Sequence, residues 1–272
     1  MKRIGLLGCG AIGTQIAIAI DIGIIPAQLT HVFDIDRTKA ETLLTKIKQK
    51  PEITDNVHLL SSNHLDLIVE AASQDAVNDN ALSILQNRKD LMIMSGGALL
   101  DESVFEIISE ACKEFKKTVY LPSGAISGLD AIKSVRNELE SVIITTTKHP
   151  RSLEGAKFFE TSKVDIDKIL EKTIIFEGTA SEAVRLFPKN VNVSALLSLA
   201  GIGSHETMVR VVADPNTDKN THQIESKGKF GKIITTVENV PDPNNPKTSR
   251  LAILSAIETL RSICSDYIKI GT

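Results

Sequence analysis

The sequence contains no tryptophan, and Trp, Tyr and Phe together account for only 4% of its residues. Proteins that hold single-stranded nucleic acid stack the bases on aromatic side chains, so this chain offers few such platforms. Its formal net charge of −3 provides no strong field for nucleic acid or for an anionic membrane surface. No apolar run reaches the length of a membrane-spanning helix. We therefore expect neither a nucleic-acid partner nor a membrane.

Cysteine is also scarce: the chain has three, Cys9, Cys112 and Cys264, far apart in the sequence. An odd number of scattered cysteines forms neither a disulfide framework nor the paired spacing of a zinc site. The acidic and histidine residues do not fall at ligand spacings either, so we expect no metal. A predicted strand at the N-terminus leaves no room for a signal peptide. We expect a cytoplasmic protein, long enough at 272 residues for two domains.

A glycine-rich turn follows the first predicted strand, residues 4–7, and precedes an apolar, helix-compatible segment, 11–22. Its glycines have the GxGxxG spacing of dinucleotide-binding folds. Gly8 permits the tight turn, Gly10 lets a pyrophosphate approach the backbone, and Gly13 lets helix and strand pack closely. Free N–H groups at the start of the helix then hold the phosphates. An ordinary turn explains this combination of strand, glycine spacing and helix less well. The expected cofactor contacts here are Gly8, Gly10, Ala11, Ile12 and Gly13.

Asp34 ends the next predicted strand, 29–33, twenty-one residues after Gly13. A carboxylate at this point can accept both hydroxyls of the adenosine ribose, which favours NAD and repels a 2′-phosphate. Arg37 offers a charge partner to such a phosphate, so NADP stays open as a second cofactor. We expect NAD.

Strands alternate with helices over the first 121 residues, which predicts a Rossmann-type α/β domain with a doubly wound parallel sheet. Small residues at 71–75, 95–98 and 122–128 follow three of its strands, at the edge where ligands of such sheets bind. Ala72 and Ser73 are therefore further expected cofactor contacts. The expected strands are 4–7, 29–33, 57–60, 65–70, 91–94 and 119–121, and the expected helices are 11–22, 37–48, 76–87 and 101–115.

The pattern changes in residues 122–245, which we expect to form an α+β domain for substrate binding and dimerisation. Its sheet is expected to be largely antiparallel, with the last three strands joined as a meander. A long amphipathic helix, 249–268, is expected to return the C-terminal segment, 246–272, to the first domain. The expected strands of this domain are 141–147, 174–176, 208–213, 223–227 and 232–238, and its expected helices are 180–186 and 193–200.

The chain has six histidines, and a histidine with its reference pKa of about 6.5 can hold or release a proton near neutrality. Each of them is more commonly a surface or hydrogen-bonded polar residue than a catalyst. His222 differs because it begins a predicted strand after the polar turn 218–221, in the expected substrate domain. It is the best candidate for a general base.

Several motifs occur in the order found in L-aspartate dehydrogenases, and the sequence resembles that family over essentially its whole length. The glycine motif is shared with many dehydrogenases. The stretches Phe-Pro-Lys-Asn-Val-Asn-Val and Asn-Pro-Lys-Thr-Ser are far more specific. The motifs that carry the resemblance are 8–13, 70–73, 122–130, 187–193, 212–215, 220–222, 238–241 and 245–249.

The resemblance implies NAD(P)-dependent oxidation of L-aspartate to iminoaspartate, or the reverse reaction from oxaloacetate and ammonia. It also implies that the imine feeds quinolinate and NAD biosynthesis, and that the protein is a homodimer. His222 matches the position of the family's catalytic histidine. Ala125 matches a nicotinamide-side contact, and either Asn190 or Asn192 matches another.

Two carboxylates of such a substrate need cations, because charge-assisted hydrogen bonds hold carboxylates best. Lys148 is one candidate, although residues 148–151 read Lys-His-Pro-Arg where the family pattern has a basic residue followed by Lys-Pro-Pro. Lys247 is another, beside hydroxyls that either bind an anion or cap the following helix. The candidates for substrate binding are Lys148, Arg151, Lys247, Thr248, Ser249 and Arg250.

Three alternatives stay open at this stage. The chain is compatible with a reductase resembling dihydrodipicolinate reductase, although it lacks the His-His-x-x-Lys stretch of such enzymes. It is also compatible with a homoserine dehydrogenase-like enzyme. A protein that senses NAD without catalysis is the third alternative.

Overall fold

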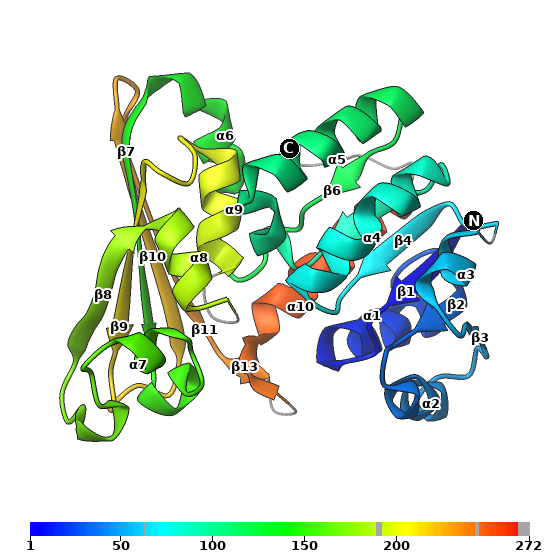
Figure 1. Ribbon diagram of the computed structural model, residues 1–272, viewed down its shortest axis with the longest axis horizontal. Coiled ribbons are helices and arrows are strands. Elements are labelled where there is room, and N and C mark those ends of the chain that lie inside the picture. The colour runs from blue at the N-terminus through cyan, green and yellow to red at the C-terminus, as the bar shows by residue number, and fades with distance from the viewer. Residues whose placement is uncertain (63, 189–191, 243–244, 266–272) are drawn as a thin grey trace. The chain divides into compact units, whose positions relative to one another are not determined.

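The computed structural model describes residues 1–62, 64–188, 192–242 and 245–265. The chain divides into two compact units. Among the described residues, the first comprises Met1–Pro122 and 253–265, and the second comprises Ser123–Ala252 (Figure 1). The change of unit near the C-terminus falls inside helix α10 (Arg250–Cys264).

The first unit contains a six-stranded sheet in the order β3-β2-β1-β4-β5-β6. All of its paired strands run parallel. The order reverses between β1 and β4, which creates the switch point where ligands of doubly wound sheets bind. The expected Rossmann-type sheet is thus confirmed. Its strands are β1 (Lys2–Leu7), β2 (Ala27–Phe33), β3 (Glu52–Ile53), β4 (Leu67–Glu70), β5 (Asp90–Ile93) and β6 (Val119–Tyr120).

Helices cover both faces of this sheet (Figure 1). Ile4 on β1, Ile16 on α1 and Leu260 on α10 belong to one buried cluster, so the C-terminal helix packs on this unit as expected. On the opposite face, a Cβ added at Gly5 would press against Leu60 of α3. The helices of this unit, besides α10, are α1 (Ala11–Asp21), α2 (Arg37–Thr45), α3 (Val57–Ser62), α4 (Gln74–Gln86) and α5 (Glu102–Phe115), with a 3-10 turn, η1 (Gly96–Leu100).

The expectation of a strand at 57–60 is wrong, because these residues form helix α3. The side chain of Asn56 accepts a hydrogen bond from the Leu59 N–H at 2.8 Å, as a helix-capping side chain does. Leu60 is fully buried. The cap and this burial outweigh the weak strand tendency of a four-residue apolar run.

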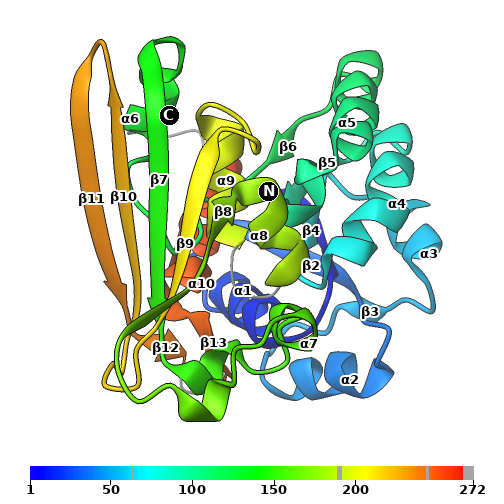
Figure 2. The same cartoon turned by 60° about the vertical axis from the view of Figure 1, so that its left-hand side comes forward.

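The second unit contains a five-stranded sheet in the order β11-β10-β7-β9-β8 (Figure 2). A small ladder of β12 (Pro241–Asp242) and β13 (Asn245–Ser249) accompanies it. The strands are β7 (Leu139–Lys148), β8 (Thr173–Thr179), β9 (Thr207–Ala213), β10 (Asn220–Gly228) and β11 (Gly231–Asn239). The helices are α6 (Leu129–Ser134), α7 (Phe158–Thr161), α8 (Ala180–Leu186) and α9 (Asn192–Ala200), with 3-10 turns η2 (Arg136–Glu138), η3 (Pro150–Leu153) and η4 (Ile166–Lys168).

This sheet is not the expected meander. Strands β10 and β11 do form an antiparallel hairpin, but β9 pairs in parallel with β7 rather than with β10. The ten-residue strand β7 pairs along both of its edges, with β10 on one side and β9 on the other. Strands adjacent in sequence are therefore separated in space by a strand formed some 60 residues earlier, which local patterns do not reveal.

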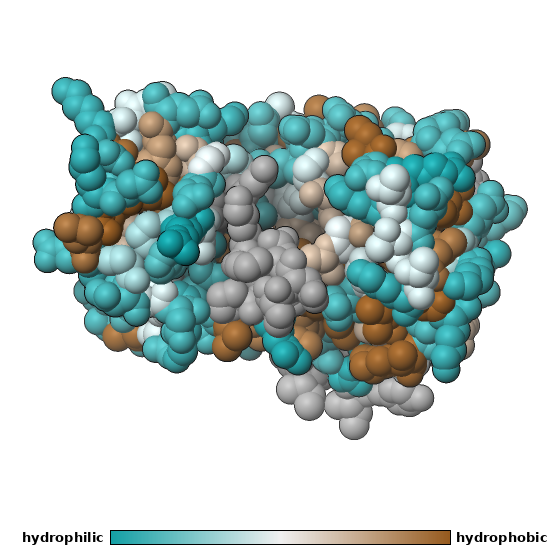
Figure 3. Space-filling model, turned by 90° about the horizontal axis from the view of Figure 1, so that it is seen from below, coloured by the Kyte–Doolittle hydropathy of each residue, from teal (hydrophilic) through white to brown (hydrophobic). Residues whose placement is uncertain are grey.

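The two faces of this sheet differ in burial. Alternate residues of β7 (Val142, Ile144, Thr146 and Lys148) are all buried, and α8 and α9 pack against β8 and β9. The other face carries exposed polar side chains such as Gln223. On the surface seen in Figure 3, hydrophobic residues form small separate groups among hydrophilic ones. No helix within the described ranges is long and apolar enough to cross a membrane.

Candidate active site

The glycine turn joins β1 to α1 in the conformation that the motif requires. Gly8 has a φ of +101°, a region that favours glycine, and its N–H donates to the Phe33 carbonyl at 2.8 Å. A Cβ at Gly13 would collide with the Gly8 carbonyl oxygen, whereas a Cβ at Gly10 would meet open space. Gly10 caps α1 without a side-chain hydrogen bond, and no acidic residue occupies the first turn. The first N–H groups of α1 are thus available to an anion, and Ala11 and Ile12 lie in that turn.

Asp34 lies beside this turn, as the sequence pattern predicts. Its Oδ2 accepts the Cys9 N–H at 2.8 Å, and its Oδ1 accepts the Asp36 N–H at 2.9 Å. Each oxygen retains capacity for a further donor, such as a ribose hydroxyl. Burial and the Asp34 charge raise the pKa of the Cys9 thiol to about 12, which makes Cys9 a neutral filler rather than a nucleophile.

Glu70, at the end of β4, is a buried carboxylate to which the sequence pattern assigned no role. Its Oε1 accepts the Ala72 N–H at 2.7 Å and the Ser95 hydroxyl at 2.8 Å. Its Oε2 accepts the Met94 and Ser95 N–H groups at 3.1 and 3.0 Å. Burial raises the pKa of Glu70, and these four hydrogen bonds oppose that shift. Glu70 thus joins the ends of β4 and β5 next to the expected contacts Ala72 and Ser73.

His222 belongs to a polar cluster on the buried face of the second sheet. The register of β10 on β7 places it directly opposite Thr146, and its Nδ1 is 3.0 Å from the Thr146 Oγ1. The exposed fraction of His222 is 3%. Burial, and secondarily the charge of Lys148, lowers the pKa of His222 to about 3. The imidazole is therefore neutral at physiological pH.

Lys148, two residues beyond Thr146 on β7, shares this face because strand side chains alternate. Its exposed fraction is 4%, and burial lowers its pKa to about 8. No described residue forms an ion pair with it. A buried ammonium without a counter-charge is costly unless a ligand supplies one, so Lys148 is a candidate position for binding an anion.

Two asparagines lie at the same end of the sheet. Asn220 and Asn239 pair across β10 and β11, and both are nearly fully buried. The Asn239 Nδ2 donates to the Ala125 carbonyl at 3.0 Å, which holds the loop of that expected cofactor contact. Neither Asn220 Nδ2 nor Asn239 Oδ1 has a hydrogen-bond partner within the described ranges. The sequence pattern placed Asn220 in the polar turn 218–221, whereas the structure includes it in β10, two residues before His222 and on the same face.

For the remaining predicted site residues, the structure gives only their position and burial. Asn192 begins α9, and Ser249 is buried at the end of β13. Arg151 and Arg250 are exposed. Asn190 and the side chains of Lys247 and Thr248 lie outside the described part of the structure.

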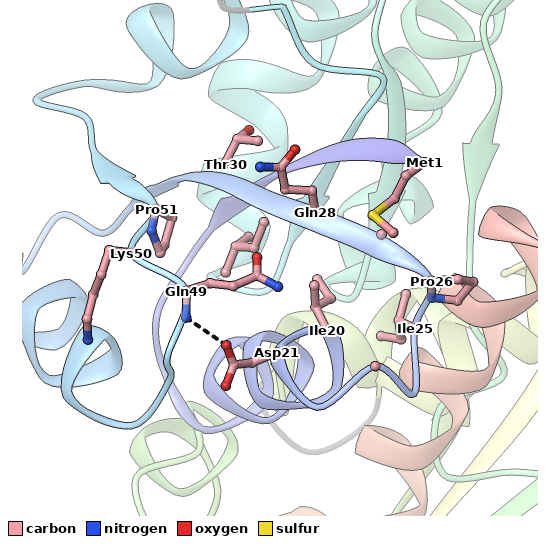
Figure 4. Close-up of a pocket in the computed structure, with 13 residues that line it drawn as sticks. Met1, Ile20, Asp21, Ile25, Pro26, Gln28, Thr30, Gln49, Lys50 and Pro51 are labelled. Atoms are coloured by element: carbon pink, nitrogen blue, oxygen red, sulfur yellow. Dashed lines mark hydrogen bonds between the residues drawn. The ribbon is translucent and has the colours of Figure 1, made fainter.

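A pocket of about 730 Å³ lies elsewhere in the first unit, lined by the end of α1 and the start of β2 (Figure 4). The Asp21 carboxylate is already hydrogen-bonded there, because it accepts the Gln49 N–H at 2.7 Å and the Lys48 N–H at 3.0 Å. The pocket adjoins the amino ends of the strands, opposite the glycine turn. It is not the expected cofactor site. Within the described ranges, no group of three or more His, Cys, Asp or Glu side chains could hold a metal ion.

Comparisons with known proteins agree with this geometry. A family model described as aspartate dehydrogenase, C-terminal, matches residues 130–263, and one described as homoserine dehydrogenase, NAD-binding domain, matches 8–122. The L-aspartate dehydrogenases of Nitrosopumilus maritimus and Methanocella arvoryzae are 67% and 47% identical to this chain, over 100% of each protein.

Solved structures show the same relationship. The crystal structure of aspartate dehydrogenase from Thermotoga maritima has a TM-score of 0.77 at 29% identity, covering 99% of this chain and 100% of its own. Scyllo-inositol dehydrogenase from Lactobacillus casei shares the fold, with a TM-score of 0.60 at 14% identity over 96% of this chain and 87% of that one. Fold, glycine turn and matches together define an NAD(P)-dependent dehydrogenase. More narrowly, the chain belongs to the L-aspartate dehydrogenase family.

Replacing Glu70 by Gln is expected to lower the free energy of unfolding by about 1–3 kcal/mol. An amide nitrogen in place of Oε1 would face the Ala72 N–H, whereas the Ser95 hydroxyl can rotate to accept. An amide nitrogen in place of Oε2 would face the N–H donors of Met94 and Ser95. At least one buried donor thus loses its acceptor. Urea unfolding measures the change, with Glu106→Gln on the exposed side of α5 as a control expected to stay within about 0.5 kcal/mol. Equal stability of Glu70→Gln and wild type would contradict this interpretation.

Proposed function

We propose that this protein is an L-aspartate dehydrogenase that oxidises L-aspartate to iminoaspartate with NAD, or forms L-aspartate from oxaloacetate and ammonia. One observation carries the proposal. A buried ammonium without an acid partner, Lys148, lies on the same sheet face as the neutral imidazole of His222. An amino acid with a side-chain carboxylate needs both a cation and a base, and the relatives of this chain carry the matching name.

NAD supplies the hydride acceptor when it is bound. The glycine turn fits a dinucleotide, because open space at Gly10 and the uncapped N–H groups of α1 can receive its phosphates. Arg37 forms exposed ion pairs with Glu41 at 3.3 Å and Asp55 at 3.0 Å, with which a 2′-phosphate would have to compete. This supports NAD over NADP. The cofactor contacts that we propose are Gly8, Gly10, Ala11, Ile12, Gly13, Asp34, Ala72, Ser73, Ala125 and one or both of Asn190 and Asn192.

Lys148 is proposed to bind a substrate carboxylate, and the unpartnered amide of Asn220 offers a further donor nearby. Lys247, Thr248 and Ser249 stay proposed contacts for the second carboxylate. His222 is proposed as the general base. It takes a proton from the substrate ammonium before the α-hydrogen leaves as hydride, or from water that attacks the imine. Its lowered pKa keeps it unprotonated before the reaction.

The resemblance to L-aspartate dehydrogenases also supports proposals about the pathway, location and oligomeric state of this protein. We propose that the imine feeds quinolinate and NAD biosynthesis, that the protein acts in the cytoplasm, and that it forms a homodimer. Isoleucines on the open face of the second sheet, Ile174 and Ile234, are more than half exposed and could contribute to such an interface.

The purified protein is expected to reduce NAD with L-aspartate but not with L-glutamate, L-alanine or L-homoserine. His222→Ala should lower kcat by about 100- to 10,000-fold, because a general base contributes that much, while NAD affinity stays unchanged. Steady-state kinetics and calorimetry measure the two effects. The control is His205→Ala, because His205 is an exposed histidine of the same unit. Turnover of homoserine instead of aspartate would favour the homoserine dehydrogenase alternative, and NAD binding without turnover of any substrate would indicate a sensor.

Asp34→Ser is expected to lower kcat/KM with NAD by about 10- to 100-fold, since the ribose loses a charged acceptor. The preference for NAD over NADP should shrink, because the carboxylate that repels a 2′-phosphate is gone. Parallel assays with both cofactors measure the ratio. Asp36→Ser removes a carboxylate two residues away and keeps a side chain able to cap α2, so it should leave the ratio unchanged. A wild-type enzyme that prefers NADP would show this assignment to be wrong.

Binding of a dicarboxylate without an amine, such as succinate, is expected to weaken above pH 8. Lys148 is protonated below its pKa of about 8 and loses its charge as the pH rises through that value. The inhibition constant of succinate should rise by about tenfold per pH unit beyond that point, the slope of a single titrating group. Lys148→Met should bind succinate weakly at every pH. A wild-type inhibition constant that stays flat from pH 7 to 10 would exclude Lys148 as the anchor.

A further inference from the structure

Thr146 is the one described residue that hydrogen-bonds the His222 ring, with 3.0 Å between its Oγ1 and the ring Nδ1. Thr146 is fully buried and His222 nearly so, which keeps bulk water from replacing this contact. We propose that Thr146 is a positioning residue for the aspartate reaction. Its hydroxyl fixes the imidazole ring and accepts a hydrogen bond from Nδ1–H when Nε2 becomes protonated. The proposal rests on the proposed function, in which His222 is the base.

The contact determines which ring nitrogen is available. In a neutral imidazole one nitrogen carries the proton and the other accepts. Nδ1 is engaged by Thr146, whereas Nε2 has no partner within the described ranges. Nε2 is therefore the nitrogen left for a ligand. Because a hydroxyl both donates and accepts, Thr146 can serve Nδ1 in either tautomer without rotation of the ring.

The contact matters most when the ring is charged. As the substrate ammonium gives up a proton, its N–H bond breaks, an N–H bond forms at Nε2, and the electron pair stays on the substrate nitrogen. The imidazolium then has N–H groups on both sides, and Nδ1–H donates to the Thr146 oxygen. This charge is costly here, because burial and Lys148 both disfavour it.

The other strand neighbours of His222 carry no negative charge that would stabilise the imidazolium. On β11, the residue opposite His222 is Val237, which has no polar side chain. Along β10, the same face continues to Asn220 and Ile224, neither of which carries a charge. Lys148 is the charged group among the described residues whose field reaches the ring, and it repels the imidazolium. The Thr146 hydroxyl is the acceptor that the fold places within hydrogen-bond distance of Nδ1.

Three consecutive threonines give a matched experiment. Thr146→Val preserves shape and removes the hydroxyl, and Thr146→Ser restores the hydroxyl. Thr145→Val makes the same chemical change on the opposite face of β7, where the side chain is only half-buried. We expect Thr146→Val to lower kcat for L-aspartate by about 10- to 100-fold, as loss of a hydrogen bond to a charged group does. KM and NAD affinity should stay close to wild type, and the solvent deuterium isotope effect on kcat should increase.

Thr146→Ser and Thr145→Val should both retain kcat near the wild-type value. A Thr146→Val enzyme with unchanged kcat would overturn the proposal, and so would a Thr146→Ser enzyme as slow as Thr146→Val. Thermal unfolding of each variant separates these results from misfolding.

Nitrogen NMR of histidine-labelled protein provides a second readout that needs no turnover. The His222 Nδ1 and Nε2 shifts should change in Thr146→Val and not in Thr145→Val. If the wild type fails to oxidise L-aspartate, the proposed function fails, whereas the NMR comparison still tests the contact. Identical His222 shifts in Thr146→Val and wild type would then contradict it.

Discussion

The burial of the Lys148 ammonium without a carboxylate partner is the constraint on which the candidate site depends. Removing a charge from water costs several kcal/mol, and nothing in the described structure near Lys148 offsets this by ion pairing. Lys148 is buried because β7 is paired along both edges and its face is covered. This burial makes Lys148 the proposed anchor for an anion, and its charge adds to the larger effect of burial in lowering the pKa of the adjacent His222.

Glu70 in the first unit shows the opposite solution to the same problem. It too is a buried ionisable group, but four donors from its own chain surround it. A carboxylate satisfied in this way has no capacity to spare for a ligand, and it acts by fixing the ends of two strands. The contrast gives a physical criterion. A buried ionic group whose partners are all internal supports structure, whereas one without internal partners points to a ligand.

Local signals predicted most of the elements, and the two failures had different causes, one a nearby helix cap with burial and the other a pairing with a distant strand. The Rossmann-type sheet followed from apolar runs, a glycine motif with defined spacing and regular alternation with helices. Residues 57–60 became a helix because Asn56 caps it and Leu60 is buried. Strand β9 lies beside β7 rather than beside its neighbour in sequence, since pairing in a sheet depends on chain crossings that no local window contains.

The sequence alone determined the glycine turn, the acid that follows the second strand, the choice of His222 as a candidate base, and the family. These depend on residue types at fixed spacing, because a turn, a strand end or a motif is a local property of the backbone. Only the tertiary structure decided what surrounds His222. The register of β10 on β7 brings Thr146 to its ring, and burial lowers the pKa values of both Lys148 and His222. Hydrogen-bond partners and pKa values arise from contacts between residues 76 positions apart, which spacing within one segment cannot encode.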